Sequence, residues 1–353
     1  MFKHLRASLS LLLATVVIFC VLYPLVLLGI GKTIFPAQAA GSLIDRKGQL
    51  TTDPAKAVGS RLIAQAFTKV EYFQPRPSAA SYNAAASQAS NYSANNTALR
   101  DRVAQSLGPI AKYRTGPNKG KPVAPDIEKW FAEQDRTKAK GAPGLLSQWA
   151  DSHPTAAGNW VKNGDKSLTD YIADWQKAHP KEVADWIKDN PPATPEPQPA
   201  DVAVPFFKSF SDQHPGKFPS SADHPTADGK TEKKIDLVSE GSDVQSVFFD
   251  LWLQAHSDAD LEQVPGDLVT TSASGLDPHI TLDNATYQLD RVAGEWANKL
   301  KRDKAEVQKE IEALLKEKAF APLGGLVGVK LINVLEINLA LVNRYEPAAP
   351  AGK

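Results

Sequence analysis

Small and hydroxyl-bearing residues crowd together with an acid and a histidine in one stretch, Ser272 to His279. Ser272, Ser274 and Gly275 could bring backbone N–H groups and hydroxyls close to an anion such as phosphate, as turn-type anion nests do. The same composition is also typical of a tight structural turn that uses its hydroxyls internally. The residue types therefore predict either an anion contact or a structural loop, and both interpretations stay open at this point.

Carboxylates and a histidine in and after this stretch could coordinate a cation, and they are Asp277, His279 and Asp283. Helix capping and loop hydrogen bonds are the other roles of such residues. The sequence contains no Ser-His-Asp set, Walker loop or HExxH motif. The only cysteine, Cys20, lies near the N-terminus, which excludes an intrachain disulfide and cysteine chemistry in the rest of the chain. We expect no catalytic residue and no bound metal.

An uncharged, mostly apolar run from Ala7 to Gly31 precedes the polar part of the chain. As a helix, a run of this length rises roughly 37 Å, which exceeds the ~30 Å hydrocarbon core of a bilayer. Pro24 lies within it, where a membrane helix tolerates a kink. We predict a single N-terminal transmembrane helix that anchors a large polar body.

A cleaved secretory signal is the alternative, because Ala37-Gln38-Ala39 has an A-x-A pattern. The apolar run is longer than the roughly 7–15 residues usual in signals, which favours a retained anchor. Lys3 and Arg6 precede the run, whereas only Lys32 follows it closely. By the positive-inside rule, this bias places the N-terminus in the cytoplasm and the body outside it.

Composition limits the remaining organisation. The 353 residues suffice for one or two domains with real cores, and the 40 basic and 40 acidic side chains balance without a basic patch, so we expect no nucleic-acid partner. Glycine and proline become frequent after residue 107, and residues 191–199 read as a polyproline-type spacer. We divide the chain into an anchor (1–35), a first half of the body (36–107), a Pro-rich insertion (108–246), a second half of the body (247–345) and a tail (346–353).

An internal repeat lies in the predicted insertion. The segment Trp149 to Pro154 (WADSHP) recurs as Trp175 to Pro180 (WQKAHP), with fainter copies at Phe210 to Pro215 and Trp252 to His256. A short helix that ends before His-Pro, with its aromatic residue buried on a neighbour, explains the pattern. The repeat is either a docking module or the core of a small helical insertion, and the wide histidine spacing argues against a metal site.

Periodicity predicts the elements of the body. Apolar residues at helical spacing predict helices at 59–67, at 99–107 with Thr97 as a possible cap, after Asp283 as N-cap, and at 303–318 with a solvated Lys/Glu face. Residues 247–253 fit a helix or a strand, 264–270 extended chain, and 329–341 a central strand. The sequence thus predicts a mixed α/β body on one transmembrane helix, with a mainly helical insertion.

Several separate blocks resemble, in order, the C subunits of the Kdp potassium-transporting ATPase. They are the N-terminal span, GSRLIAQAF (59–67), YFQPRPSA (72–79), the Ser90-Asn91 neighbourhood, PGDLVTTSASGLDPHI (265–280), YQLDRVA (287–293) and INVLEINLAL (332–341). The resemblance covers about residues 1–107 and 247–345 and does not extend to 108–246. The family loop usually reads SGSGLDP, and Ala273 stands here in place of its first glycine.

The resemblance implies a non-catalytic, accessory subunit of a high-affinity, ATP-driven potassium import complex in the bacterial inner membrane. It implies a channel-like potassium-binding subunit, a P-type ATP-hydrolysing subunit and a small single-span subunit as partners. It also implies a role in assembly and, as a catalytic chaperone, in raising the ATP affinity of the hydrolysing subunit. The family's nucleotide contacts correspond by position to Ser272, Ser274, Gly275 and Gln288, so ATP is the implied cofactor, held directly or only through the partner.

These implications conflict on one point, because an exported body cannot touch cytoplasmic ATP. With the body outside, we expect it to cover the outer mouth of the channel-like subunit and to act through packing or electrostatics. The alternative function is a membrane-anchored extracytoplasmic binding or scaffold protein that uses the aromatic repeat.

Overall fold

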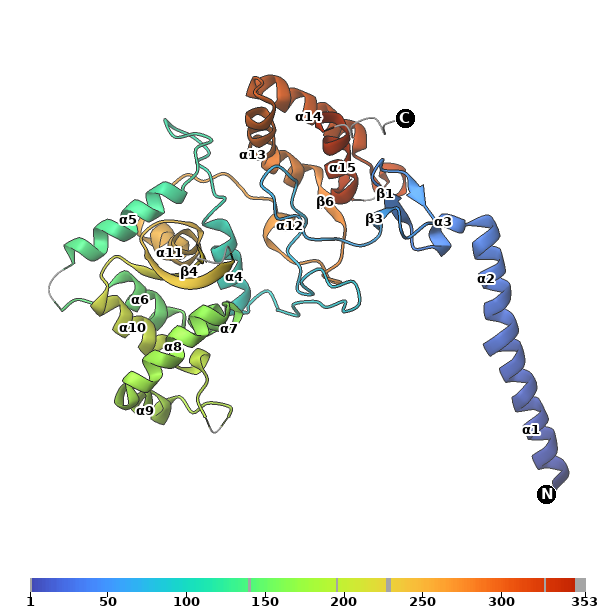
Figure 1. Ribbon diagram of the computed structural model, residues 1–353, viewed down its shortest axis with the longest axis horizontal. Helices are drawn as coiled ribbons and strands as arrows, with labels where there is room; N and C mark the ends of the chain where they lie inside the picture. Colours follow the sequence, from blue (N-terminus) through green and yellow to red (C-terminus); the bar gives the residue numbers. More distant parts are fainter. Residues whose placement is uncertain (1, 139–140, 195, 227–229, 327, 347–353) are drawn as a thin grey trace. The chain divides into compact units, whose positions relative to one another are not determined.

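The computed structural model describes residues 2–138, 141–194, 196–226, 230–326 and 328–346 (Figure 1). Contacts divide the chain into two compact units, which we call the anchor unit (Met1–Ser90 with Pro265–Lys353) and the central unit (Asn91–Val264). The proposed insertion limits at 108 and 246 stay a prediction. All of the predicted tail except Glu346 lies outside the described residues.

The N-terminal helix is continuous from Phe2 to Ile34, and its length and apolar character are sufficient to cross a membrane. It consists of α1 (Phe2–Val16), a π-helical stretch (Val17–Leu22) and α2 (Tyr23–Ile34). The π-helical geometry immediately precedes Pro24, whose ring has no N–H to donate and would clash with the carbonyl of a regular turn. None of its residues is buried within the chain, as expected for a helix surrounded by lipid or by other helices. The A-x-A pattern lies in the short helix α3 (Pro36–Ala39).

A small antiparallel sheet follows α3, with β1 (Leu43–Asp45) between β2 (Leu50–Thr51) and β3 (Ala57–Ser60). The helix predicted at 59–67 is therefore wrong. Gly59 pairs with Ile44, and the Ala64 N–H donates to the carbonyl of Leu276 at 2.9 Å. Backbone partners distant in sequence thus replace the bonds that a local helix would have used.

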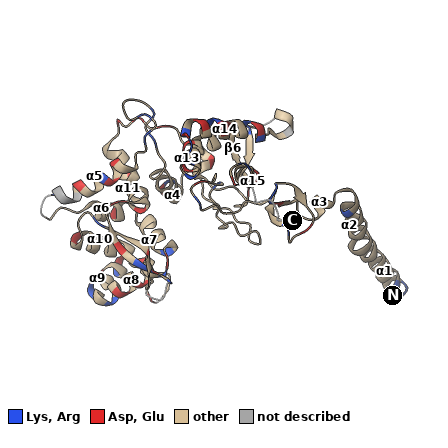
Figure 2. Cartoon of the chain, turned by 45° about the horizontal axis from the view of Figure 1, so that its top comes forward, with Lys and Arg blue, Asp and Glu red and all other residues tan. Residues whose placement is uncertain are grey.

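Three helices form most of the anchor unit's core, namely α13 (Leu282–Leu300), α14 (Lys304–Lys318) and α15 (Val334–Tyr345). Figure 1 shows them near β6 (His279–Thr281), which pairs antiparallel with β7 (Leu331–Asn333). Trp296, Val292, Ile311 and Ile337 are fully buried between them. Figure 2 shows both charge signs along α14, and Lys316 pairs with Glu312 at 2.6 Å, so the predicted solvated Lys/Glu face is confirmed.

The predicted starts of two of these helices have different outcomes. Asp303 caps α14 by accepting from the Glu306 N–H at 3.1 Å, which confirms the helix at 303–318. The cap of α13 is Thr281 rather than Asp283, because the Thr281 hydroxyl accepts from the Asn284 N–H at 3.1 Å. Asp283 lies in the first helical turn, where a carboxylate still complements the helix dipole.

The predicted central strand at 329–341 is wrong, since only Leu331–Asn333 is extended and α15 follows at once. The Asn333 side chain accepts from the Glu336 N–H at 3.1 Å and so starts the helix. Val334, Ile337 and Leu341 then point into the core at helical spacing. The extended segment predicted at 264–270 is also wrong, because it contains the short helix α12 (Gly266–Val269).

The central unit is mainly helical. Its helices are α4 (Thr97–Leu107), α5 (Ala124–Thr137), α6 (Leu145–Ser152), α7 (Pro154–Asn163), α8 (Lys166–Ala178), α9 (Pro180–Asp189), α10 (Ala203–Gln213) and α11 (Ser242–Ala255). An antiparallel hairpin, β4 (Phe218–Pro225) with β5 (Thr231–Val238), completes it. The ambiguous segment 247–253 lies in α11, and the cap of α4 is Asn96 rather than Thr97.

The repeated His-Pro segments are helix ends, as the sequence predicted. His153 and His179 terminate α6 and α8, and the prolines that follow occupy the first turns of α7 and α9. The His179 ring nitrogen bonds to the Trp175 carbonyl at 2.9 Å, and the two rings stack at 4.8 Å. Each histidine ring therefore adds a second hydrogen bond to a carbonyl in the last turn of its helix, which already accepts the histidine backbone N–H.

One of these histidines also holds two helices together. His153 is buried, and its Nε2 lies 3.1 Å from Oδ2 of Asp250 on α11. The hydrogen bond to Asp250 and the nearby charge of Asp101 raise the pKa of His153, although burial opposes them. The same bond lowers the pKa of Asp250, to which the positive charge of Arg100 also contributes. In weakly acidic solution, His153 is therefore positively charged and Asp250 is negatively charged.

A His153→Gln variant should report this pair through the pH dependence of stability. The raised histidine pKa adds stability below the unfolded value of 6.5 that is lost as pH rises through the folded pKa. The lowered aspartate pKa adds stability above 3.8 that is lost in stronger acid. Thermal unfolding should show a Tm lower by roughly 5 °C at pH 6 and a smaller loss at pH 8.

His179→Gln is the matched control, since the His179 ring bonds to a carbonyl of its own helix as the His153 ring does. No ion pair to a carboxylate is present for His179 among the described residues. Without such an ion pair, its Tm change should differ less between the two pH values than that of His153→Gln. Equal pH dependence in the two variants would contradict the assignment of an ionised His153–Asp250 pair.

Candidate functional site

The loop from Ser272 to Pro278 connects α12 to β6, and its own hydroxyls hold its shape. The Ser274 hydroxyl accepts from the Leu276 N–H at 3.1 Å, and the Ser272 hydroxyl lies 3.4 Å from the Asp277 N–H. The Gly275 N–H donates to the Ser272 carbonyl at 3.2 Å. Ser272 is buried, so its hydroxyl serves the loop rather than the surface.

A second segment of the anchor unit closes over this loop. The Ser78 hydroxyl donates to the Gly275 carbonyl at 2.5 Å, and the Gln88 N–H donates to the Ser274 carbonyl at 3.0 Å. Gly275 has φ +68°, and a Cβ there would stand 2.6 Å from the Gln88 carbonyl oxygen, so only glycine fits. Ala273 lies outside the left-handed region, so alanine replaces the usual glycine without backbone strain.

Gln288, the fourth predicted nucleotide contact, is buried on α13 with its amide fully used. Its Oε1 accepts from the Gln74 N–H at 2.8 Å and from the Arg291 guanidinium at 2.7 Å. Its Nε2 donates to the Gln74 carbonyl at 3.0 Å and to Oδ1 of Asn284 at 2.7 Å. The side chain thus makes the same two hydrogen bonds to the peptide backbone of Gln74 that a neighbouring β-strand would make.

Asn338 on α15 does the same for the preceding residue. Its Oδ1 accepts from the Phe73 N–H at 2.9 Å, and its Nδ2 donates to the Phe73 carbonyl at 2.8 Å. Sequence reasoning missed Asn338, although an asparagine inside the apolar run INVLEINLAL was the signal. A buried amide in such a run needs partners.

We call residues 72–78 the strap. Its prolines, Pro75 and Pro77, keep it extended and have no N–H to satisfy. Beyond Gln74, the Arg76 guanidinium donates to the Thr271 carbonyl at 3.0 Å, and Ser78 reaches Gly275. The strap therefore connects Gln288 to the Ser272–Pro278 loop, and among the described residues Gln288 and that loop share no direct hydrogen bond.

The three residues considered for a cation do not form one cluster. Asp277 Oδ1 accepts from the N–H of His279 at 3.0 Å and lies 3.1 Å from its Nδ1. Burial raises the pKa of Asp277, but the bonds from His279 outweigh it and the net shift is downward. Asp283 is exposed on α13. Within the described residues no group of three metal-ligating side chains occurs.

Asp267 is a polar partner that sequence reasoning also missed. Its carboxylate accepts from the Thr281 N–H at 2.7 Å, the Thr281 hydroxyl at 3.0 Å and the Asn284 side chain at 3.1 Å. Asn284 in turn accepts from Gln288. A chain of side-chain bonds therefore runs from α12 along the start of α13 to the strap.

Removing either amide should destabilise the anchor unit without touching its apolar core. Asn338→Ala or Gln288→Ala leaves a backbone N–H and C=O of the strap without partners, which costs about 1–3 kcal/mol for each unpaired buried group. We expect both variants to unfold at lower urea concentration and lower temperature than the parent chain.

Gln74→Ala is the matched control, because Gln74 contributes only its backbone to these bonds and its side chain is exposed. Its stability should stay within about 0.5 kcal/mol of the parent. A loss in Gln74→Ala equal to that in Gln288→Ala would contradict the pairing described above.

Comparison of the sequence with known proteins shows which family the chain resembles. Residues 5–128 and 243–343 match the KdpC family, described as the K+-transporting ATPase, c chain. The chain is 44% identical over 113 residues to the potassium-transporting ATPase KdpC subunit of Pseudomonas syringae pv. tomato, covering 32% of this chain and 56% of that protein.

Two further relatives carry the same name. The protein from Pseudomonas aeruginosa PAO1 is 45% identical over 106 residues, covering 30% of this chain and 54% of the relative. That from Methylorubrum populi is 38% identical over 141 residues, covering 36% and 65% respectively. The chain thus spans between 54% and 65% of the length of these curated relatives, and they are named as a subunit of the ATPase. Both parts of the family pattern occur in order in this sequence, and they contain the strap and the Ser272–Pro278 loop. The chain therefore belongs to the KdpC family of K+-transporting ATPase c chains.

Proposed function

We propose that this chain is an accessory subunit of a high-affinity, ATP-driven potassium import complex, needed for its assembly. The observation that carries the proposal is the family match on both sides of the central segment, including the apolar N-terminal helix. The proposed partners are a channel-like potassium-binding subunit, a P-type ATP-hydrolysing subunit and a small single-span subunit.

The N-terminal helix supports a role in assembly. Its apolar side chains are exposed from end to end within this chain, so lipid or partner helices must cover them. The charge bias of Lys3 and Arg6 against Lys32 supports a cytoplasmic N-terminus and an extracytoplasmic body in the bacterial inner membrane. Cys20 is exposed in the same helix. It can be labelled chemically, or it can be replaced so that a single cysteine can be introduced elsewhere.

For the effect on ATP, we propose that this chain raises the affinity of the hydrolysing subunit through contact with its partners. Gln288 makes four hydrogen bonds inside the chain, and the hydroxyls of Ser272 and Ser274 bond within their own loop. Direct nucleotide contact by Ser272, Ser274, Gly275 and Gln288 is the competing proposal. It requires Gln288 to release Gln74, at the cost of unpaired buried groups.

The function as an anchored scaffold that grips a partner with its aromatic repeat has less support. Trp149, Trp175 and Trp252 are buried in the core of the central unit. Their indole faces are therefore used for packing rather than for docking.

The pump proposal is tested by purifying the membrane complex with and without this chain. We expect the complex without it to be recovered in lower yield, and its potassium-stimulated hydrolysis to need a higher ATP concentration for half-maximal rate. The complex with Gln74→Ala serves as a control for expression. Unchanged assembly together with an unchanged ATP dependence would overturn the proposal.

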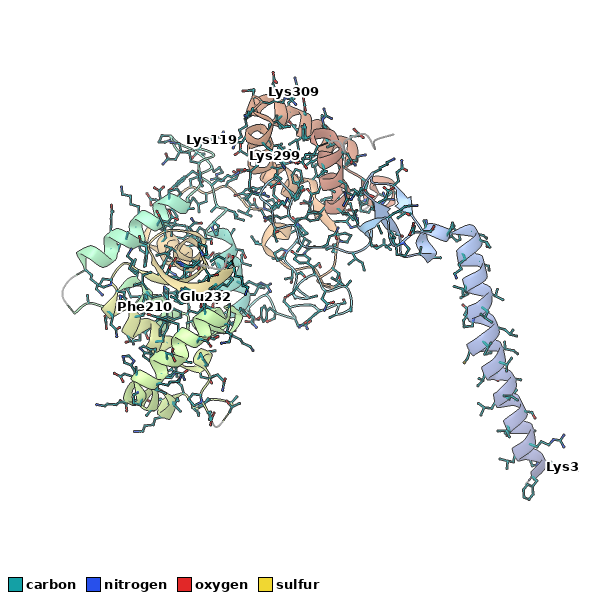
Figure 3. The ribbon with its side chains drawn as sticks, viewed as in Figure 1. Lys3, Lys119, Phe210, Glu232, Lys299 and Lys309 are labelled. Carbon is teal, nitrogen blue, oxygen red and sulfur yellow. The ribbon has the colours of Figure 1, made fainter. Side chains whose placement is uncertain are left out.

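Sidedness is tested with single cysteines in a Cys20→Ser background. Figure 3 labels Lys3 on α1 and Lys309 on α14, and both are exposed. In intact spheroplasts, a membrane-impermeant maleimide should label Lys309→Cys and should label Lys3→Cys only after permeabilisation. The reverse pattern would place the body in the cytoplasm and would favour direct contact with ATP.

A further inference from the structure

A pocket of about 400 Å³ lies inside the central unit, where α4, α7, α8, α11 and the β4–β5 hairpin meet. Figure 1 shows these elements gathered in one unit. Helices α7 and α8 and the hairpin lie in residues 129–242, outside the stretches that match the family. The pocket is thus built largely by the part of the chain that the proposed pump function leaves unexplained.

Three side-chain amides line the pocket. They belong to Gln105 on α4 and to Asn159 and Asn163 on α7. Among the described residues, none of the three amide groups makes a hydrogen bond to the protein. Each amide offers an acceptor and two donors, so together they can bond a ligand that both donates and accepts.

An indole provides the apolar wall. Trp160 lines the pocket and is partly exposed, and its ring meets Phe218 edge-on at 5.5 Å, which holds its orientation. Leu168 and Pro219 continue this wall. An indole beside these amides combines apolar contact with directional bonds.

The frame around the pocket is rigid. Asp165 caps α8 by accepting from the Ser167 N–H at 2.9 Å, and it also accepts from the Ser167 hydroxyl at 2.6 Å and from the Ser221 hydroxyl of β4. These bonds and the ammonium of Lys233 at 3.4 Å hold the pKa of Asp165 far below its usual range. These bonds hold the hairpin against the start of α8, so the site is largely preformed.

The charges at the pocket compensate one another. Lys233 lies between Asp165 at 3.4 Å and Asp223 at 3.6 Å. Asp243, which also lines the pocket, accepts from the Ser220 hydroxyl at 2.5 Å. An anionic ligand would face these carboxylates, and a cation would face Lys233, so a neutral ligand fits best.

We propose that this pocket binds a neutral saccharide. Hydroxyl groups donate and accept in the way the three amides require, and the apolar face of a sugar ring matches the indole of Trp160. The volume lies within the roughly 300–1,000 Å³ of small-molecule sites. This activity is separate from potassium transport and does not depend on the pump proposal.

The test uses the full chain in lipid nanodiscs that were prepared without a sugar-based detergent, because alkyl glycosides would occupy the site. Glucose, N-acetylglucosamine, cellobiose and N,N′-diacetylchitobiose are the probes, with glucose 6-phosphate as an anionic comparison. Saturation-transfer NMR and calorimetry should detect at least one neutral sugar, and glucose 6-phosphate should bind more weakly than glucose.

The double variant Asn159→Ala/Asn163→Ala should weaken this binding at least tenfold while retaining the parent Tm, because these amides make no bonds within the described protein. Asn298→Ala, on the exposed surface of α13, should bind as the parent does. The proposal is overturned if none of the four neutral sugars binds, if glucose 6-phosphate binds best, or if the double variant binds unchanged.

Discussion

The anchor unit depends on two side-chain amides that pair with consecutive peptide groups of the strap. Asn338 takes the N–H and C=O of Phe73, and Gln288 takes those of Gln74. A β-sheet would supply the same bonds from a neighbouring strand, but here two helices supply them from their side chains. Because unpaired backbone groups are costly in a segment that is partly buried, this pairing fixes where the strap lies against α13 and α15.

The consequence is a long-range closure of the chain. The bonded residues are separated by 265 positions for Asn338 and Phe73 and by 214 for Gln288 and Gln74. The segment that follows the membrane helix is thereby joined to the closing helices, although the whole central unit lies between them in sequence. A long intervening segment is compatible with this closure because the entropy of loop closure grows only slowly with loop length.

The two units are stabilised by different means. The anchor unit combines an apolar core around Trp296 with a chain of side-chain amides and carboxylates along α12 and α13. The central unit packs aromatic residues such as Phe131 and Phe248, whose rings stack at 4.2 Å, and ends α6 and α8 with histidines. The tryptophans of the repeat are buried, so the repeat contributes to packing within the unit although its pattern resembles a docking module. The amides of Gln105 on α4 and of Asn159 and Asn163 on α7, which make no hydrogen bond within the described part of the chain, line the proposed ligand pocket of this unit.

The sequence by itself determined the features that depend on local chemistry. The length of the apolar run, the His-Pro helix ends, the helix at 303–318 and the family blocks all follow from residues close together in the chain. Tertiary structure decided the rest. Gly59–Phe67 has a helical apolar pattern, but its backbone bonds go to Ile44 and Leu276. The run 329–341 alternates like a strand, yet Asn333 starts a helix whose buried face packs on α13 and α14. The sequence likewise singled out Gln288, but it did not indicate its partner in the strap. A hydrogen bond between residues more than two hundred positions apart leaves no periodic signal in the sequence.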